Sequence, residues 1–137
     1  MKKMLCDINV FIDIFLKRKD FYPASAAVFA MAEKRKVKGC VSGASFNILF
    51  YLLQKELSRN KASEILKKIR SVFCVAPVTE KVIDYSIGSS IKDFEDAVQY
   101  YCAYLSGADF LVTRNKRDYK KGDKNLHVLT PAEFIVL

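Results

Sequence analysis

The chain has 137 residues, of which 51% are hydrophobic and 28% are charged. This length suits one domain over residues 1–137, and the composition excludes a disordered chain and permits a core without disulfides or structural metal. The formal net charge of +8 favours polyanionic partners such as nucleic acids, although a basic surface can also serve solubility alone.

Short apolar runs alternate with longer stretches of helical periodicity along the chain. In chain order this pattern predicts a strand at residues 4–6, helices at 8–16 and 23–35, a strand at 39–41, helices at 44–56 and 60–71, a strand at 72–75, helices at 79–87 and 94–105, strands at 110–112 and 127–129, and a short terminal helix from 131. Ser42, Thr79 and Thr130 are expected helix caps, and Gly107 is an expected left-handed residue after a helix. The alternation is typical of an α/β domain with a parallel sheet.

The four cysteines have no close C-x-x-C spacing and lie mostly within apolar runs, at Cys6, Cys40, Cys74 and Cys102. We expect free, buried thiols in a reducing compartment. The basic start of the chain leads into an apolar run that Asp7 interrupts at once. We therefore expect that the chain has no signal peptide and no membrane span. The expected location is the cytoplasm.

Acidic residues from separate parts of the chain fall where one edge of the predicted sheet should lie. Asp7 directly follows the first strand, and Asp118 follows the fourth strand after a short turn. Asp93, Glu95 and Asp96 lie at the start of the helix that precedes the fourth strand. In open parallel sheets the ligand site lies beyond the carboxyl ends of the strands. Because clustered carboxylates repel one another, such a group normally implies a divalent cation, and magnesium prefers oxygen ligands.

Each acid also has a plain structural explanation. Asp7 belongs to a residue type that caps helices well, and Asp93 and Glu95 are favourable charges at a helix N-terminus. Asp118 has basic neighbours and fits an ordinary loop. Asp96 is harder to explain in this way, because it lies one turn into an apolar helix.

Four segments carry a resemblance to a known family, in the same order along the chain. They are residues 5–13 (LCDINVFID), 93–99 (DFEDAVQ), 111–119 (LVTRNKRDY) and 128–134 (VLTPAEF). Through these segments the sequence resembles the PIN-domain family, and more narrowly the VapC-like toxin ribonucleases of prokaryotic type II toxin–antitoxin pairs. The resemblance implies a PIN-like three-layer α/β/α fold around a central parallel sheet of about four to five strands.

The resemblance also implies roles for individual residues. Asp7, Asp96 and Asp118 match the acids that the family uses for catalysis and for binding Mg²⁺ or Mn²⁺. Asp93 is a further expected metal ligand, because one turn of helix places it on the same face as Asp96. Residues expected to support the site are Asn9, Asn47, Thr113 and Asn115.

The sequence departs from the family pattern at one position. Family members usually carry an acid on the helix after the second strand, and that position falls here on Ile48 or, with a slip of one residue, on Asn47. An asparagine amide oxygen can bind a cation or position a water, but it brings no charge. Either Asp93 or Glu95 compensates, or metal affinity is weakened, or the site has lost its activity.

Basic residues surround Asp118 and are expected to contact RNA phosphates, with a solvated loop as the alternative. They are Arg114, Lys116, Arg117, Lys120, Lys121 and Lys124. Tyr100 and Tyr101 are expected to pack in or beside the core rather than to stack on bases. His127, in the fifth predicted strand, is expected to be a structural or surface residue.

The expected activity is metal-dependent hydrolysis of RNA phosphodiesters. The resemblance implies an antitoxin protein as a partner, a dimer is a further expectation, and no membrane partner is expected. One alternative is a catalytically silent PIN fold that binds RNA or a protein, which the missing acid motivates. Another is a nuclease directed at DNA, which the small size disfavours.

Overall fold

The computed structural model describes residues 1–119 and 126–137 of the chain. In chain order its elements are β1 (Lys3–Cys6), α1 (Ile8–Phe15), α2 (Tyr22–Glu33), β2 (Lys38–Ser42), α3 (Gly43–Glu56), α4 (Arg59–Val72), β3 (Cys74–Ala76), α5 (Glu80–Ile87), α6 (Phe94–Leu105), β4 (Phe110–Val112), the 3₁₀-helix η1 (Lys116–Tyr119), β5 (His127–Leu129) and α7 (Pro131–Phe134). Helices and strands therefore alternate as the sequence predicts.

The five strands form one parallel sheet in the order β3-β2-β1-β4-β5. β1 is central, with Met4 beside Gly39 of β2 and beside Phe110 of β4. Because all the strands run in the same direction, their carboxyl ends meet at one edge of the sheet. This arrangement brings the residues that follow β1 and β4 next to each other, and Asp7 N donates to Val112 O at 2.9 Å.

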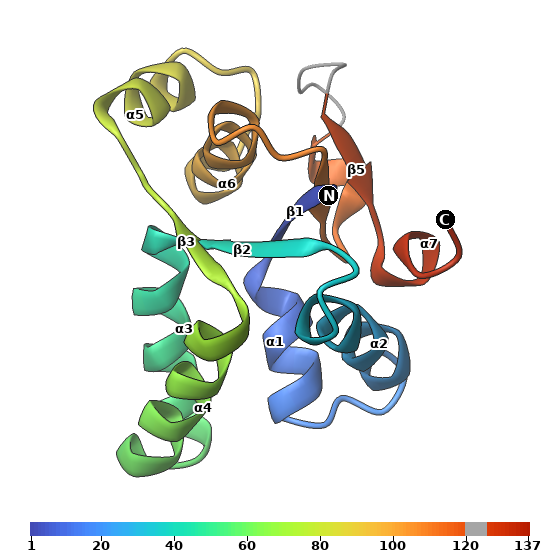
Figure 1. Cartoon of the computed structure of the whole chain (residues 1–137). Helices are drawn as coiled ribbons and strands as arrows, with labels where there is room; N and C mark the ends of the chain where they lie inside the picture. Colours follow the sequence, from blue (N-terminus) through green and yellow to red (C-terminus); the bar gives the residue numbers. More distant parts are fainter. Residues whose placement is uncertain (120–125) are drawn as a thin grey trace.

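Helices cover both faces of this sheet (Figure 1). Helices α1 to α4 lie on one face, and α5 and α6 lie on the other. Side chains alternate along β1, so Met4 and Cys6 pack with the first group of helices and Leu5 packs with the second. The expectation of a three-layer α/β/α fold is confirmed.

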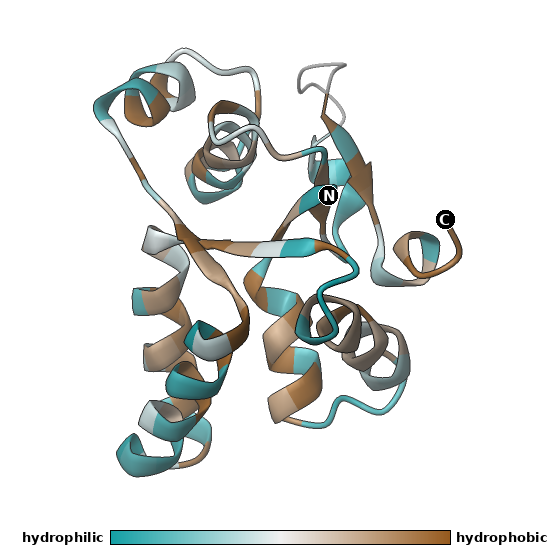
Figure 2. Cartoon of the chain, in the orientation of Figure 1, coloured by the Kyte–Doolittle hydropathy of each residue, from teal (hydrophilic) through white to brown (hydrophobic). Residues whose placement is uncertain are grey.

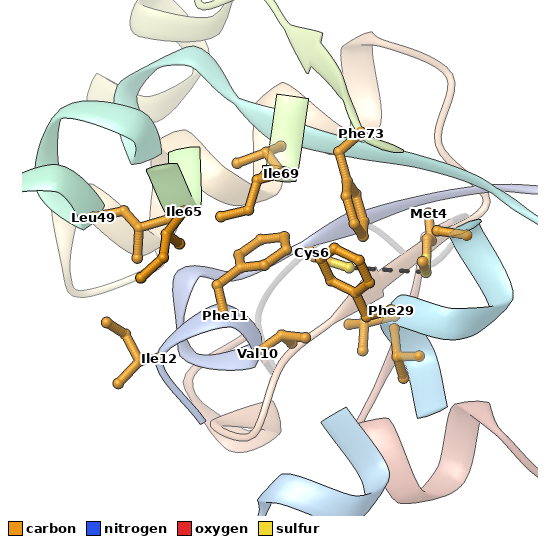
Figure 3. Close-up of a cluster of buried hydrophobic side chains, with 14 of the residues drawn as sticks. Met4, Cys6, Val10, Phe11, Ile12, Phe29, Leu49, Ile65, Ile69 and Phe73 are labelled. Carbon is orange, nitrogen blue, oxygen red and sulfur yellow. Dashed lines mark hydrogen bonds between the residues drawn. The ribbon is translucent and has the colours of Figure 1, made fainter. Parts of the chain in front are cut away.

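Phenylalanine rings fill the core between α1, α2 and the end of α4 (Figure 3). The Phe11 ring meets the edges of Phe29 and Phe73, with centroids 6.3 Å and 5.0 Å away. Gly39 lets Phe73 approach β2, since a Cβ at this position would lie 2.6 Å from the ring. In Figure 2 brown segments run through the central strands, whereas α4 shows much teal.

The third strand differs from its prediction. It spans Cys74–Ala76 and not residues 72–75, because α4 continues to Val72 and Phe73 is its C-cap. Phe73 is buried among aromatic rings. Its apolar character comes from this packing against helices and not from a place in the sheet.

The expected caps are present at the helix ends. Val82 N donates to Thr79 Oγ1 at 3.2 Å, and Thr130 forms a reciprocal capping box with Glu133. Ala44 N donates to the Ser42 hydroxyl, and Gly107 has a φ of +79° after α6.

Three further expectations concern side chains. All four cysteines are free, and Cys6, Cys40 and Cys102 are buried while Cys74 is exposed. Tyr100 is fully buried and stacks on Tyr119, so its expected packing role is confirmed. His127 is exposed on β5 beside the Phe110 ring. Across residues 1–119 and 126–137, no helix has the length and apolar character that crossing a membrane requires.

Candidate active site at the carboxyl edge of the sheet

Asp7 is a buried carboxylate that protein donors hold from several directions. Thr113 Oγ1 donates to Asp7 Oδ2 at 2.7 Å, and Asn9 Nδ2 donates to the same oxygen at 3.3 Å. Asn115 N donates to the Thr113 hydroxyl, so the loop after β4 is tied to this contact. Together these hydrogen bonds fix the orientation of the carboxylate.

Asp7 is also the N-cap residue of α1, but its side chain makes no capping hydrogen bond. The first turn of α1 therefore leaves the carboxylate available for other contacts. The capping explanation of this aspartate holds for its backbone alone.

Gln99 of α6 is a third donor to Asp7. Its Nε2 donates to Asp7 Oδ1 at 3.2 Å. Gln99 was not among the residues expected to support the site, although it lies three residues after Asp96 on a helix that is otherwise apolar there. A buried amide one turn after a candidate ligand is the signal that could have identified it.

Asp96, in the first turn of α6, lies close to the other acids. Burial, followed by the negative charges of Asp93, Asp118 and Asp7, raises its pKa to about 6. Tyr119 Oη donates to Asp96 Oδ1 at 3.3 Å. Burial, followed by the charge of Asp7, raises the pKa of the Tyr119 hydroxyl strongly, so this group stays a donor. Tyr119 was also not predicted as part of the site.

Asp93 is the N-cap of α6, because its Oδ1 accepts from Asp96 N at 3.0 Å. It lines an open cleft of about 770 Å³ together with Asp96 and Asp118. Asp118 reaches this cleft from η1, whose turn is closed by the bond from Asp118 N to Asn115 O. The structure thus gathers all four predicted acids on one side of the molecule, with Asp93 also acting as a cap.

The helix after β2 brings no acid to this site. Asn47 and Ile48 line a second pocket, of about 390 Å³, whose walls also include Asp7 and Asp96. The position where the family usually has an acid therefore faces the other carboxylates, and an amide and an alkyl chain occupy it.

The carboxylates gathered here suit a cation that keeps part of its water shell. Within residues 1–119 and 126–137, no three His, Cys, Asp or Glu side chains are grouped closely enough to hold a metal ion by themselves. Mg²⁺ is commonly bound through one or two carboxylates and several waters. The mutual repulsion that raises the pKa of Asp96 is also the kind of field that a bound cation relieves.

Two of the predicted phosphate-binding residues form ion pairs within the protein. Arg114 Nε lies 2.9 Å from Asp13 Oδ2, with its guanidinium stacked 4.1 Å from the centre of the Phe21 ring. Lys116 Nζ lies 3.0 Å from Glu133 Oε2. Arg117 lines the cleft beside Asp118. Lys120, Lys121 and Lys124 lie outside the described residues.

A three-layer fold with a parallel sheet and carboxylates gathered at its carboxyl edge defines the class of this protein. A family model described as PIN domain matches residues 3–117, and the chain belongs to this family.

Named relatives agree with this assignment. Ribonuclease VapC1 from Aquifex aeolicus (strain VF5) is 27% identical over 138 residues, covering 97% of this chain and 93% of that protein. The structure of VapBC2 from Rickettsia felis bound to a promoter DNA fragment matches with a TM-score of 0.72 at 18% identity, covering 93% of this chain and 98% of that one. A toxin–antitoxin complex from Klebsiella pneumoniae matches with a TM-score of 0.68 at 20% identity, covering 93% and 97%. These two structures support the fold.

Proposed function

We propose that this protein is a metal-dependent endoribonuclease that hydrolyses RNA phosphodiesters and acts as the toxin of a toxin–antitoxin pair. The observation that carries the proposal is the buried Asp7 carboxylate, held by Thr113, Asn9 and Gln99 and facing Asp96. The ribonuclease named above, similar over nearly the whole chain, supports RNA as the substrate.

Asp7, Asp96 and Asp118 are the proposed catalytic residues, and the proposed ligands of Mg²⁺ or Mn²⁺ are these three with Asp93. Such a cation, when bound, supplies positive charge and lowers the pKa of a coordinated water. Thr113 and Gln99 orient Asp7, while the Tyr119 hydroxyl orients Asp96. These bonds preorganise the carboxylates before substrate binds.

Arg117 is the proposed phosphate contact at the cleft, since it lines the cavity that contains Asp96 and Asp118. Arg114 and Lys116 stay predicted phosphate contacts, and each would have to share its charge with Asp13 or Glu133. The roles of Asn47 and Asn115 as supporting residues also stay predictions.

An antitoxin protein is the proposed partner, because a similar structure is a toxin–antitoxin complex. Self-association into a dimer remains a prediction, which analytical ultracentrifugation of the purified chain checks.

The function is tested by cleavage of a single-stranded RNA by the purified protein, with and without Mg²⁺. Wild type should cleave in a metal-dependent manner, and Asp96→Asn should lose most of this activity. Asp84→Asn, an exposed acid on α5, is the matched control and should cleave like wild type. A duplex and a single-stranded DNA of the same sequence test the choice of RNA. Cleavage that survives in Asp96→Asn would remove the basis of the proposal.

A silent RNA- or protein-binding module is the second candidate. Asn47 and Ile48 favour it, because they leave the pocket beside Asp7 one carboxylate short of the family pattern. The same assay decides between the two, since a silent module binds RNA and gives no metal-stimulated cleavage.

A further inference from the structure

The pocket beside Asp7 has an apolar side. It opens between the start of α3, α5 and the start of α6, and its volume is about 390 Å³. Its apolar lining includes Ile8, Ile48, Val78, Ile83 and Phe94. A pocket of this size, largely apolar with a few polar groups, has the character of a site for a small ring system.

Phe94 supplies an exposed aromatic ring to this pocket. It is the first residue of α6, and 51% of its surface is accessible to solvent. Ala97 and Val98, about one turn further along α6, are buried in the core, and Val98 also lines the pocket. A half-exposed phenylalanine beside a nuclease-like site provides a face on which a flat, unstacked base can lie.

The polar lining of the pocket is rich in acceptor oxygens, beside the hydroxyls of Ser42 and Ser45 and the Asn47 amide, which can also donate. Gln99 is 8% exposed, and its Oε1 has no hydrogen-bond partner in the part of the chain that the structure describes. Its Nε2 is committed to Asp7, which fixes the amide with the oxygen on the other side. Asp96 and Glu95 add carboxylate oxygens to the same lining.

This combination selects the chemistry of the occupant. Glu95, which is not one of the proposed metal ligands, would repel a phosphate on this side of the pocket, whereas a neutral base with an amino group can donate to its carboxylate. A buried acceptor without a donor is unfavourable, and a base amino group would satisfy such an acceptor.

We propose that this pocket binds one unstacked nucleobase of the RNA strand, stacked on Phe94 and preferring a base with an exocyclic amino group. The inference rests on the proposed function, because it assigns a subsite of the same substrate. It predicts discrimination between cytosine and uracil, which have the same size and differ at the amino position.

The test measures binding of short single-stranded oligocytidylate and oligouridylate by fluorescence anisotropy, with Ca²⁺ in place of Mg²⁺ and the RNA checked on a gel for integrity afterwards. Wild type should bind oligocytidylate more tightly. Phe94→Ala should weaken that binding on the order of tenfold and reduce the preference for cytosine. Phe94→Tyr should retain both, because it keeps an aromatic face.

Two further variants control this result. Tyr22→Ala removes an exposed ring on α2, in the opposite helical layer, and should bind like wild type. Ala44→Leu, at the start of α3, adds an uncharged side chain that takes up room in the pocket, and should weaken oligocytidylate binding even if Phe94→Ala were poorly folded. Circular dichroism establishes the fold of each variant.

Equal affinity of wild type and Phe94→Ala, or equal affinity for the two oligonucleotides, would overturn the base pocket. Mg²⁺-dependent cleavage by wild type, measured in parallel, separates this failure from failure of the proposed function. If wild type cleaves RNA but Phe94→Ala binds oligocytidylate as tightly as wild type, only the base-pocket proposal fails. If wild type neither binds nor cleaves RNA, both proposals fail.

Discussion

At the scale of single residues, several side chains donate hydrogen bonds to one carboxylate. Asp7 accepts from Thr113, Asn9 and Gln99, which come from three different segments of the chain. An aspartate with only a capping role would accept from a backbone amide in the first turn of α1, and the Asp7 side chain does not. This arrangement supports the proposed role of Asp7 in the site.

Removal of the Thr113 hydroxyl tests this positioning role. Thr113→Val is similar in shape and deprives Asp7 Oδ2 of its 2.7 Å donor. We expect RNA cleavage and Mn²⁺ affinity each to fall by about 10- to 100-fold, as for other residues that orient a metal ligand. Calorimetric titration with Mn²⁺ and initial cleavage rates measure the two effects. Thr113→Ser keeps the hydroxyl and should restore both, whereas equal losses in Ser and Val variants would speak against the hydrogen bond.

The protonation of Asp96 contributes to the stability of the folded protein. Its folded-state pKa, about 6, lies above the ordinary value of 3.8, so the folded protein binds this proton more tightly than the unfolded chain. The associated stability is fully present below pH 3.8 and is lost as the pH rises through 6. Asp96→Asn should therefore make the metal-free protein more stable at pH 7.5, by on the order of 1 kcal/mol after allowance for solvent screening of a partly exposed group.

Urea unfolding in EDTA at pH 7.5 and at pH 4 measures this effect. The advantage of Asp96→Asn should shrink at the lower pH, where the wild-type carboxyl is protonated in the folded state. An Asn variant that is less stable than wild type at pH 7.5 would show that burial and repulsion among the acids do not penalise the Asp96 charge.

At the scale of elements, a buried ion pair connects the loop after β4 to α1 and α2. Asp13 is fully buried, and it faces Arg114 and the Ser25 hydroxyl. Burial raises the pKa of Asp13, while the charge of Arg114 opposes this rise. Arg114 therefore holds the loop that leads to Asp118 against the first two helices.

Truncation of Arg114 should be costly. Arg114→Ala leaves a buried carboxylate without its cation, and we expect a loss of about 3–5 kcal/mol in the free energy of unfolding at neutral pH. The loss should be smaller in acid, where a protonated Asp13 needs no partner. Lys116→Ala breaks an exposed pair, with side chains 48% and 44% accessible, and should cost less than about 1 kcal/mol. Chemical denaturation measures the free energy of unfolding of both variants. Equal losses would contradict a stabilising role of the ion pair between Arg114 and Asp13.

Two glycines allow a similar comparison of stability. Gly39 of β2 packs against Phe73 at the end of α4, whereas Gly43 has more room. Gly39→Ala would place a Cβ 2.6 Å from the Phe73 ring, and it should destabilise the fold by about 1–3 kcal/mol. Gly43→Ala meets nothing closer than 3.6 Å at the start of α3 and should be neutral or slightly stabilising. Thermal unfolding of the two variants measures the difference, and a neutral Gly39→Ala would mean that the core around Phe73 yields easily.

At the scale of the whole molecule, local patterns in the sequence were enough to predict the order of helices and strands. Apolar periodicity and caps such as Thr79 and Thr130 depend on neighbours in the chain, so they could be recognised without a structure. The third strand was predicted to start two residues too early and to end one residue too early, because Phe73 is equally apolar in a strand and at a buried helix end.

The site was predicted less completely, for a physical reason. Asp7, Asp96 and Asp118 could be named because parallel strands bring their carboxyl ends together. The bonds from Gln99 and Tyr119, and the pairing of Arg114 with Asp13, join residues that are distant in sequence, and no local pattern encodes them. Basic neighbours around Asp118 suggested phosphate contacts, although a charge near an acid in sequence does not show where its side chain lies.

The central claim is that carboxylates gathered at the sheet edge make this chain a metal-dependent ribonuclease. The most direct measurement is the rate of RNA cleavage as a function of Mg²⁺ concentration, for wild type and for Asp7→Asn. We expect a rate that rises to saturation with Mg²⁺ in wild type and falls by at least about 100-fold in Asp7→Asn at every concentration. Cleavage by wild type that does not depend on the metal, or undiminished cleavage by Asp7→Asn, would contradict the claim.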